Sequence, residues 1–188
     1  MCGIIGATSS RSVGKILIKG LHAMEYRGYD SAGIALNKDS EIFRLRSLGK
    51  VSSLEELMIE NKPKAKSGIA HTRWATHGAP SEENAHPHGS HNEIYIVHNG
   101  IIENHDEVRD KLKEKGYEIS SETDSELIAH LIHLNKTDSS SILEALIKAT
   151  KELKGAFSIA AISAHEKGKI YAAKPKSPLL SGQGSEEN

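Results

Sequence analysis

The chain has 188 residues, of which 37% are hydrophobic and 26% charged, and its 24 basic and 25 acidic residues leave a net charge of −1. This length suits one sizeable domain, and the balanced charge argues against nucleic acid or an anionic membrane surface as a partner. The single cysteine excludes an internal disulfide, and the sequence shows neither a membrane-spanning apolar run nor a signal peptide, so we expect a cytoplasmic protein.

Apolar patterns in the first part of the chain predict a strand, a helix, two strands, a short helix and a further strand. In chain order these elements lie at residues 2–7, 12–25, 31–36, 41–48, 52–58 and 67–72. Ser12 is expected to cap the first helix, and Ser52 with Glu55 forms a capping-box pattern at the start of the second.

A loop rich in Pro and His separates this part from a strand at 93–98, three helices, and closing strands at 157–163 and 169–173. The helices are expected to begin near Asn104, Thr123 and Ser141, each of which is followed three residues later by Glu. Segregated helices and strands predict an α+β fold with antiparallel sheets. Because no closing element follows the last strand, we expect one domain over residues 1–188 that is cut short at its C-terminal end.

Cys2 directly follows the initiator methionine, and a small residue at this position normally permits removal of that methionine. Cys2 would then carry a thiol, whose thiolate is a nucleophile, and an α-amine with a pKa of about 7.7–8, close to the strength needed for a general base. The alternative is a small residue packed in the first strand.

Four polar stretches stand at the ends of predicted strands, where functional loops tend to lie: residues 27–33, 71–78, 98–104 and 122–126. In the third, the Asn99 side chain and the Gly100 backbone N–H suit the developing oxyanion of an attacked amide. The alternative is a hairpin turn, because Asn-Gly is a strong turn signal.

Two charged residues in these stretches form a possible clamp for a free α-amino acid. The Arg73 guanidinium suits a carboxylate, although a surface arginine stacked on Trp74 is an equally good interpretation. Asp124 suits an ammonium group, although its place in the first turn of a helix would explain it as well.

Eleven histidines raise the possibility of a metal site, either in the loop 86–91 or on the helix face shared by Glu126, His130 and His133. Structural zinc sites usually include thiolates, and the only cysteine lies far away in sequence. Nucleotide-binding glycine motifs are also missing after the predicted strands. We therefore expect no metal and no cofactor.

Five segments in order resemble a known family. Residues 1–6, 25–33, 71–78, 97–104 and 122–126 read MCGIIG, EYRGYDSAG, HTRWATHG, VHNGIIEN and ETDSE. Together they resemble the N-terminal class II glutaminase domain of the glutamine–fructose-6-phosphate amidotransferases. Tyr29, Trp74, His77 and the loop 80–88 distinguish this sugar-phosphate branch from phosphoribosylpyrophosphate amidotransferases and asparagine synthetases.

The resemblance implies a four-layer αββα sandwich of the N-terminal-nucleophile hydrolase type. It implies hydrolysis of L-glutamine through a cysteine thioester, with the ammonia used to convert fructose 6-phosphate into glucosamine 6-phosphate. The fructose 6-phosphate would bind to a sugar-isomerase half that this chain lacks, in a full-length enzyme that forms a homodimer.

The resemblance also implies roles for individual residues. Cys2 would be the nucleophile, Asn99 and Gly100 would form the oxyanion hole, and Arg27 would help to position the amino-terminal residue.

Glutamine would be held by Arg73 through its α-carboxylate and by Asp124 through its α-ammonium, in a pocket shaped by Trp74, Thr76 and His77. Two alternatives stay open: an amidotransferase domain with another ammonia acceptor, and an inactive glutamine-binding domain.

Overall fold

Two four-stranded antiparallel sheets form the centre of the computed structural model, which describes residues 2–28, 30–38, 40–74, 78–137 and 141–184. The first sheet has the order β1-β4-β2-β3, with strands β1 (Gly3–Thr8), β2 (Ser31–Lys38), β3 (Glu41–Leu48) and β4 (Ser67–Arg73). The second has the order β5-β6-β7-β8, with strands β5 (His88–Ser90), β6 (Ile94–Ile102), β7 (Gly155–Ser163) and β8 (Tyr171–Ala173).

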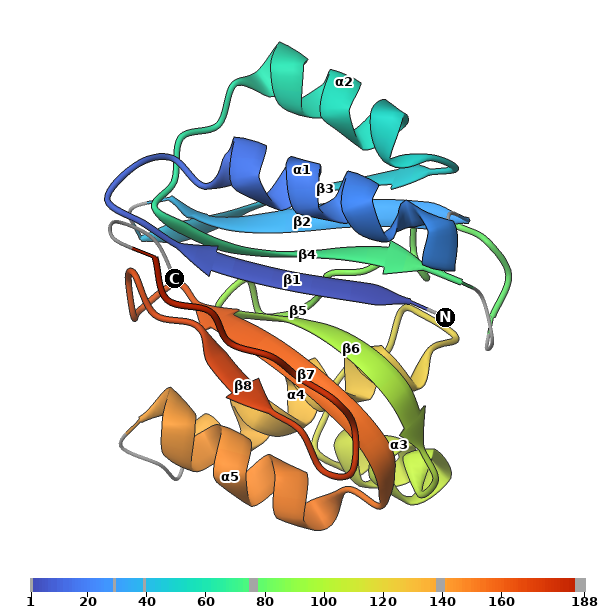
Figure 1. The fold of residues 1–188 in the computed structure, drawn as a ribbon. Coiled ribbons are helices and arrows are strands. Elements are labelled where there is room, and N and C mark those ends of the chain that lie inside the picture. Colours follow the sequence, from blue (N-terminus) through green and yellow to red (C-terminus); the bar gives the residue numbers. More distant parts are fainter. Residues whose placement is uncertain (1, 29, 39, 75–77, 138–140, 185–188) are drawn as a thin grey trace.

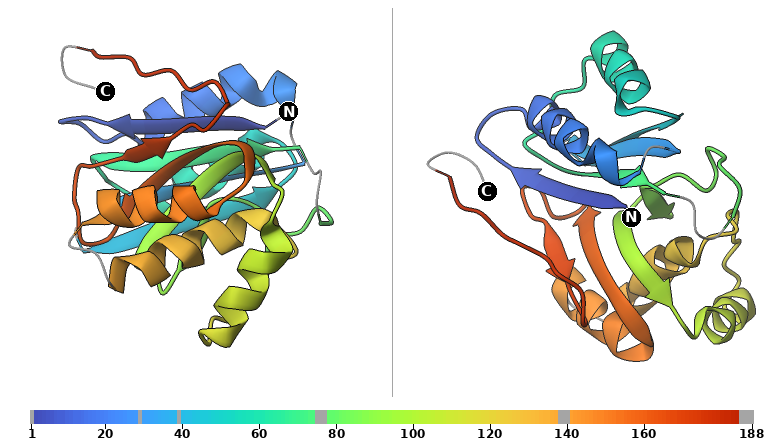
Figure 2. Two further views of the ribbon diagram at one scale, coloured as in Figure 1. Left: turned by 90° about the horizontal axis from the view of Figure 1, so that it is seen from below. Right: turned by 45° about the vertical axis from the view of Figure 1, so that its right-hand side comes forward.

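The sheets lie between two layers of helices (Figure 1). Helices α1 (Gly14–Met24) and α2 (Val51–Asn61) cover the first sheet, and the short 3-10 helix η1 (Glu25–Arg27) follows α1. Helices α4 (Asp124–Thr137) and α5 (Ile142–Glu152) cover the second sheet, and α3 (His105–Glu114) packs against α4 beyond the end of β6 (Figures 1 and 2). This arrangement confirms the expected four-layer αββα sandwich.

Three apolar clusters correspond to the three interfaces between these layers. One cluster, with Leu17, Leu21 and Leu36, lies between the first helical layer and the first sheet. A small middle cluster joins the two sheets and includes Ala35. Since neighbouring residues of a strand face opposite sides, Leu36 and Ala35 of the central strand β2 serve different clusters. The largest cluster packs α3, α4 and α5 on the second sheet.

Two of the predicted helix caps are wrong. Helix α1 begins after Val13 and has no side-chain cap, so Ser12 does not cap it. Helix α2 begins after Lys50, and its Val51 N–H donates to Glu25 Oε1 at 2.6 Å. A carboxylate from η1, distant in sequence, thus replaces the local capping box.

The remaining three caps have mixed outcomes. Ser141 caps α5 as expected, with its side chain accepting from the Glu144 N–H, and Thr123 Oγ1 accepts from the Glu126 N–H at 3.4 Å. Asn104 makes no side-chain cap on α3; its amide instead binds backbone groups of Glu152 and Lys154.

Strand β6 is longer than predicted and passes through the Asn-Gly pair. Asn99 pairs with Ser158 and Gly100 with Phe157 on β7, so the hairpin-turn interpretation of Asn99-Gly100 is wrong. Gly100 has φ +133°, and a Cβ there would lie 2.3 Å from the Ala156 carbonyl oxygen. Only glycine fits this close contact without strain. The short strand β5 was not predicted.

In the described part of the chain, no helix combines the length and apolar character needed to cross a membrane.

Candidate active site

Cys2 lies immediately before β1, which pairs with β4, and this pairing brings it to the end of β4. Its Sγ is 3.3 Å from the Trp74 backbone nitrogen, which donates to it, and 3.6 Å from the Trp74 carbonyl oxygen. Burial raises the pKa of the Cys2 thiol, while the Trp74 N–H acts in the opposite direction. A thiol that stays protonated at neutral pH needs a nearby base to become a nucleophile.

Asn99 and Gly100 reach Cys2 from the other sheet. The Asn99 Nδ2 donates to the Cys2 carbonyl oxygen at 3.0 Å, which links β6 of the second sheet to the start of β1 in the first. Gly100 and Cys2 line the same two cavities. The two expected oxyanion donors therefore lie beside the expected nucleophile.

Two cavities meet at Cys2. A small one of about 40 Å³ includes Arg73 and Asp124 in its lining. A larger one of about 570 Å³ includes Arg27, Asn99 and the segment 177–180. Cys2, Trp74 and Gly100 line both cavities. Cys2 thus borders both the cavity that contains Arg73 and Asp124 and the cavity that contains Arg27.

Arg73 ends β4 and is buried, so the alternative of a surface arginine is wrong. Its guanidinium donates to the carbonyl oxygens of Gly78 and Ala79 at 3.1 and 3.3 Å, and lies 3.6 Å from Asp30 Oδ1. Sequence reasoning did not assign Asp30 to the site, although it lies in the polar stretch 27–33. Trp74 is 54% exposed.

Asp124 is the first residue of α4, and its carboxylate also holds β6 in place. Its Oδ2 accepts from the Ile102 N–H at 2.8 Å, and its Oδ1 is 3.8 Å from His98 Nδ1. Asp124 therefore connects the helix terminus to the strand that carries Asn99. Thr76, His77 and Tyr29 lie outside the described residues.

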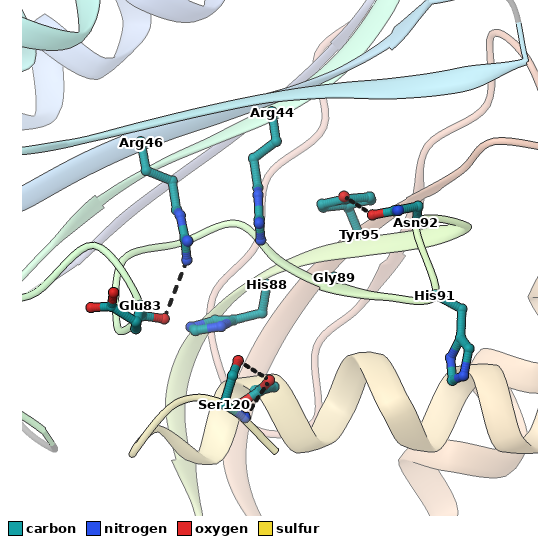
Figure 3. Close-up of a pocket in the computed structure, with 10 residues that line it drawn as sticks. Arg44, Arg46, Glu83, His88, Gly89, His91, Asn92, Tyr95 and Ser120 are labelled. Atoms are coloured by element: carbon teal, nitrogen blue, oxygen red, sulfur yellow. Dashed lines mark hydrogen bonds between the residues drawn. The ribbon is translucent and has the colours of Figure 1, made fainter. Parts of the chain in front are cut away.

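A separate polar pocket of about 150 Å³ is lined by residues of β3, β5 and α4 and of the loops near them (Figure 3). Arg46 donates to the carbonyl oxygens of Glu83 and Ala85, both at 3.2 Å, and Arg44 donates to that of Pro87 at 3.4 Å. Burial, together with the nearby Arg44, lowers the pKa of Arg46.

This pocket is lined by two arginines and two glutamates, so its formal charge is balanced and does not favour an anion. The arginines instead hold the loop before β5. That loop presents Asn84, which donates to Glu122 Oε2 and the Ala79 carbonyl oxygen, each at 3.0 Å. The pocket thereby supports the segments around Arg73 and α4.

The three histidines of the loop 86–91 lie in different environments. His86 and His88 are buried with ring centres 4.7 Å apart, whereas His91 is exposed and stacks on His133. Burial lowers the pKa of His88 to about 3 and that of His86 well below its ordinary value. His86 and His88 are therefore neutral side chains of the interior.

Solved structures share this fold. The glutamine phosphoribosylpyrophosphate amidotransferase of B. subtilis matches 87% of this chain and 35% of its own, with a TM-score of 0.75 at 23% identity. A glutamine aminotransferase class-II domain protein from Silicibacter pomeroyi matches 96% of this chain and 80% of its own, with a TM-score of 0.61 at 16% identity. At these identities the comparison establishes the fold alone.

Curated relatives found by sequence have a higher identity to this chain than these solved structures do. The glutamine–fructose-6-phosphate aminotransferases (isomerizing) of Haemophilus influenzae and Pseudomonas putida are each 51% identical over the whole of this chain. The chain spans 31% of the length of these curated relatives. A sequence model described as the glutamine amidotransferase domain matches residues 71–185, more than half of the chain. The chain therefore belongs to the glutamine amidotransferase domain family.

Proposed function

We propose that this chain hydrolyses L-glutamine to glutamate and ammonia, with Cys2 as the nucleophile. The observation that carries the proposal is the position of the Cys2 thiol. Cys2 borders a cavity that is also lined by Gly100, one arginine and one aspartate, and its carbonyl oxygen accepts from the Asn99 side chain. A nucleophile, an oxyanion site and a clamp for an α-amino acid are the parts that amide hydrolysis of glutamine requires.

The reaction follows from these parts once Met1 has been removed. The α-amine of Cys2 takes the thiol proton, and the thiolate attacks the side-chain amide carbon of glutamine. The resulting oxyanion accepts from the Asn99 side chain and the Gly100 N–H. The α-ammonium of Cys2 then gives its proton to the amide nitrogen of the intermediate, the C–N bond breaks, and ammonia departs while a thioester on Cys2 remains. Water then attacks the thioester, releasing glutamate and restoring the thiol.

Substrate selection would rest on opposite charges at the small cavity. Arg73 would bind the α-carboxylate and Asp124 the α-ammonium, while Trp74, Thr76 and His77 would shape the pocket and Arg27 would position the amino-terminal residue. Charge-assisted hydrogen bonds of this kind are stronger than neutral ones and reject analogues that lack either group.

The acceptor of the ammonia would bind outside this chain. Because the relatives at 51% identity are named for fructose 6-phosphate, we propose this sugar phosphate as the acceptor, bound by a further part of a longer protein. A different acceptor would leave the glutaminase half unchanged, since the two reactions use separate sites.

The test is release of glutamate from L-glutamine by the chain, measured by coupled assay after mass spectrometry has established whether Met1 is present. The chain without Met1 is expected to hydrolyse glutamine. The chain that keeps Met1 is expected to be slower, because the amine next to the thiol is then part of a peptide bond. Glutamine binding without glutamate release from the chain lacking Met1 would instead support the inactive glutamine-binding domain.

Replacement of Asp124 by Asn is expected to raise KM for glutamine, because the substrate ammonium loses its ionic partner. A hydrogen bond to a charged group contributes about 1.5–3 kcal/mol, so KM should rise roughly 10- to 150-fold. The Asn side-chain oxygen can still accept from the Ile102 N–H, so the melting temperature should change little. For a glutamine analogue that lacks the α-amine, Asp124→Asn should raise KM much less. An equal rise in KM for glutamine and for this analogue would remove Asp124 from this role.

A further inference from the structure

His71 on β4 contacts the side chain of Asn99 from the side opposite Cys2. Its Nε2 is 3.1 Å from Asn99 Oδ1 and also 3.1 Å from the backbone carbonyl oxygen of His98. A backbone carbonyl oxygen can only accept a hydrogen bond, so Nε2 must carry the proton. His71 is therefore present as the Nε2–H tautomer.

This tautomer determines which end of the Asn99 amide faces Cys2. The oxygen and nitrogen of an amide have nearly the same shape, so their hydrogen-bond partners decide the orientation. The His71 N–H requires an acceptor, which places Asn99 Oδ1 toward His71. The NH₂ group then faces Cys2, where it donates to the Cys2 carbonyl oxygen at 3.0 Å.

The His71 ring is itself held firmly. It is fully buried and stacks on His86 with ring centres 3.9 Å apart and planes inclined by 14°. His86 Nδ1 accepts from the His98 N–H, which ties the stack to β6. Within the described residues His71 Nδ1 has no hydrogen-bond partner, so no acceptor there competes with the His98 and Asn99 oxygens for the ring proton. Burial lowers the pKa of His71 to about 3, so the ring stays neutral near pH 7.

We propose that His71 is a positioning residue for glutamine hydrolysis: its Nε2–H holds Asn99 Oδ1 and thereby keeps the Asn99 N–H directed at the reacting centre beside Cys2. This inference rests on the proposed function. Without the His71 donor, the Asn99 side-chain amide can rotate. Its oxygen could then face the developing oxyanion, and the two oxygens would repel each other.

The first test compares His71→Leu with His71→Gln in the glutamate-release assay. Loss of a whole oxyanion donor costs about 10²–10³ in rate, so loss of its orientation in His71→Leu should lower kcat by about 10- to 50-fold. KM should stay within about twofold, because the substrate clamp is untouched. The Gln side-chain nitrogen can occupy the position of Nε2, so His71→Gln should recover most of the rate.

A matched control is His130→Gln. His130 is also buried, on α4, and its Nδ1 binds Ser90 Oγ rather than any residue at Cys2. Its kcat should match that of the unmodified chain. Unchanged kcat in His71→Leu, or an equal loss in His71→Leu and His71→Gln, would overturn the proposal.

The second test does not depend on activity. Nitrogen-15 chemical shifts of the His71 ring at pH 7 should show a protonated Nε2 and a bare Nδ1. The Asn99 side-chain amide signals should shift in His71→Leu and return toward their original positions in His71→Gln. These results would support the positioning contact even in a chain that fails to hydrolyse glutamine, whereas an Nδ1–H tautomer or a protonated ring would overturn it.

Discussion

Replacing Cys2 by Ala is expected to lower glutamate release by about 10⁴-fold or more, the order of loss that follows removal of a catalytic nucleophile in hydrolases. The reason is that every later step requires the thioester, and no other thiol exists in the chain. Alanine is also small, so it should permit the same removal of Met1. The measurement is single-turnover and steady-state release of glutamate at saturating glutamine.

Two observations would make this result specific to the nucleophile. Calorimetric titration of Cys2→Ala should still show glutamine binding, because Arg73 and Asp124 remain in place. Cys2→Ser should also be severely impaired, since a hydroxyl is a much weaker nucleophile than a thiol activated by the same amine. Glutamate release by Cys2→Ala at a rate near that of the unmodified chain would refute both the nucleophile and the mechanism.

Replacing Asn99 by Ala is expected to lower kcat by about 10²–10³-fold, the usual cost of losing one oxyanion donor, with KM little changed. The Gly100 N–H would remain as the second donor, which is why activity should persist at a low level. The same change leaves the Cys2 carbonyl oxygen without its partner. Leaving a fully buried polar group unpaired costs about 1–3 kcal/mol, and because Cys2 is only half-buried the urea midpoint should fall by less than that cost implies.

Asn99→Asp tests the loss of the donor while keeping the size of the side chain. It keeps the shape of the side chain and an acceptor for His71, but it cannot donate and adds a negative charge near the oxyanion. It should therefore lose at least as much kcat as Asn99→Ala. An Asn99→Asp chain with near-normal turnover would exclude the Asn99 side chain from stabilising the oxyanion.

The four-layer fold explains how these residues meet. Cys2 lies beside β1 of one sheet, and Asn99 lies on β6 of the other, so the proposed reacting centre lies where the two sheets come together. Asp124 holds β6 through the Ile102 N–H, and Gly100 permits close approach of β6 to β7. The residues of the site are thus fixed by strands and a helix terminus.

Residue pattern alone was sufficient to predict most elements and to propose candidate residues for the site. Apolar periodicity depends on neighbours in the chain, so it predicted β3 at its observed bounds and an α+β fold. The cap at Ser141 also uses residues close in sequence. The functional segments could be recognised because Cys2, Arg73, Asn99 and Asp124 each stand in a distinctive short motif.

Only the tertiary structure decided features that depend on distant partners. Asn99-Gly100 continues a strand instead of turning, because both residues lie in register with Ser158 and Phe157 of β7. Glu25 caps α2 in place of a local side chain because η1 lies against the start of that helix. The tautomer of His71 is set by the His98 carbonyl, 27 residues away. These hydrogen bonds join segments that are far apart in the sequence, so they form only when the fold brings the segments together. A local sequence pattern does not specify which distant segments will pair.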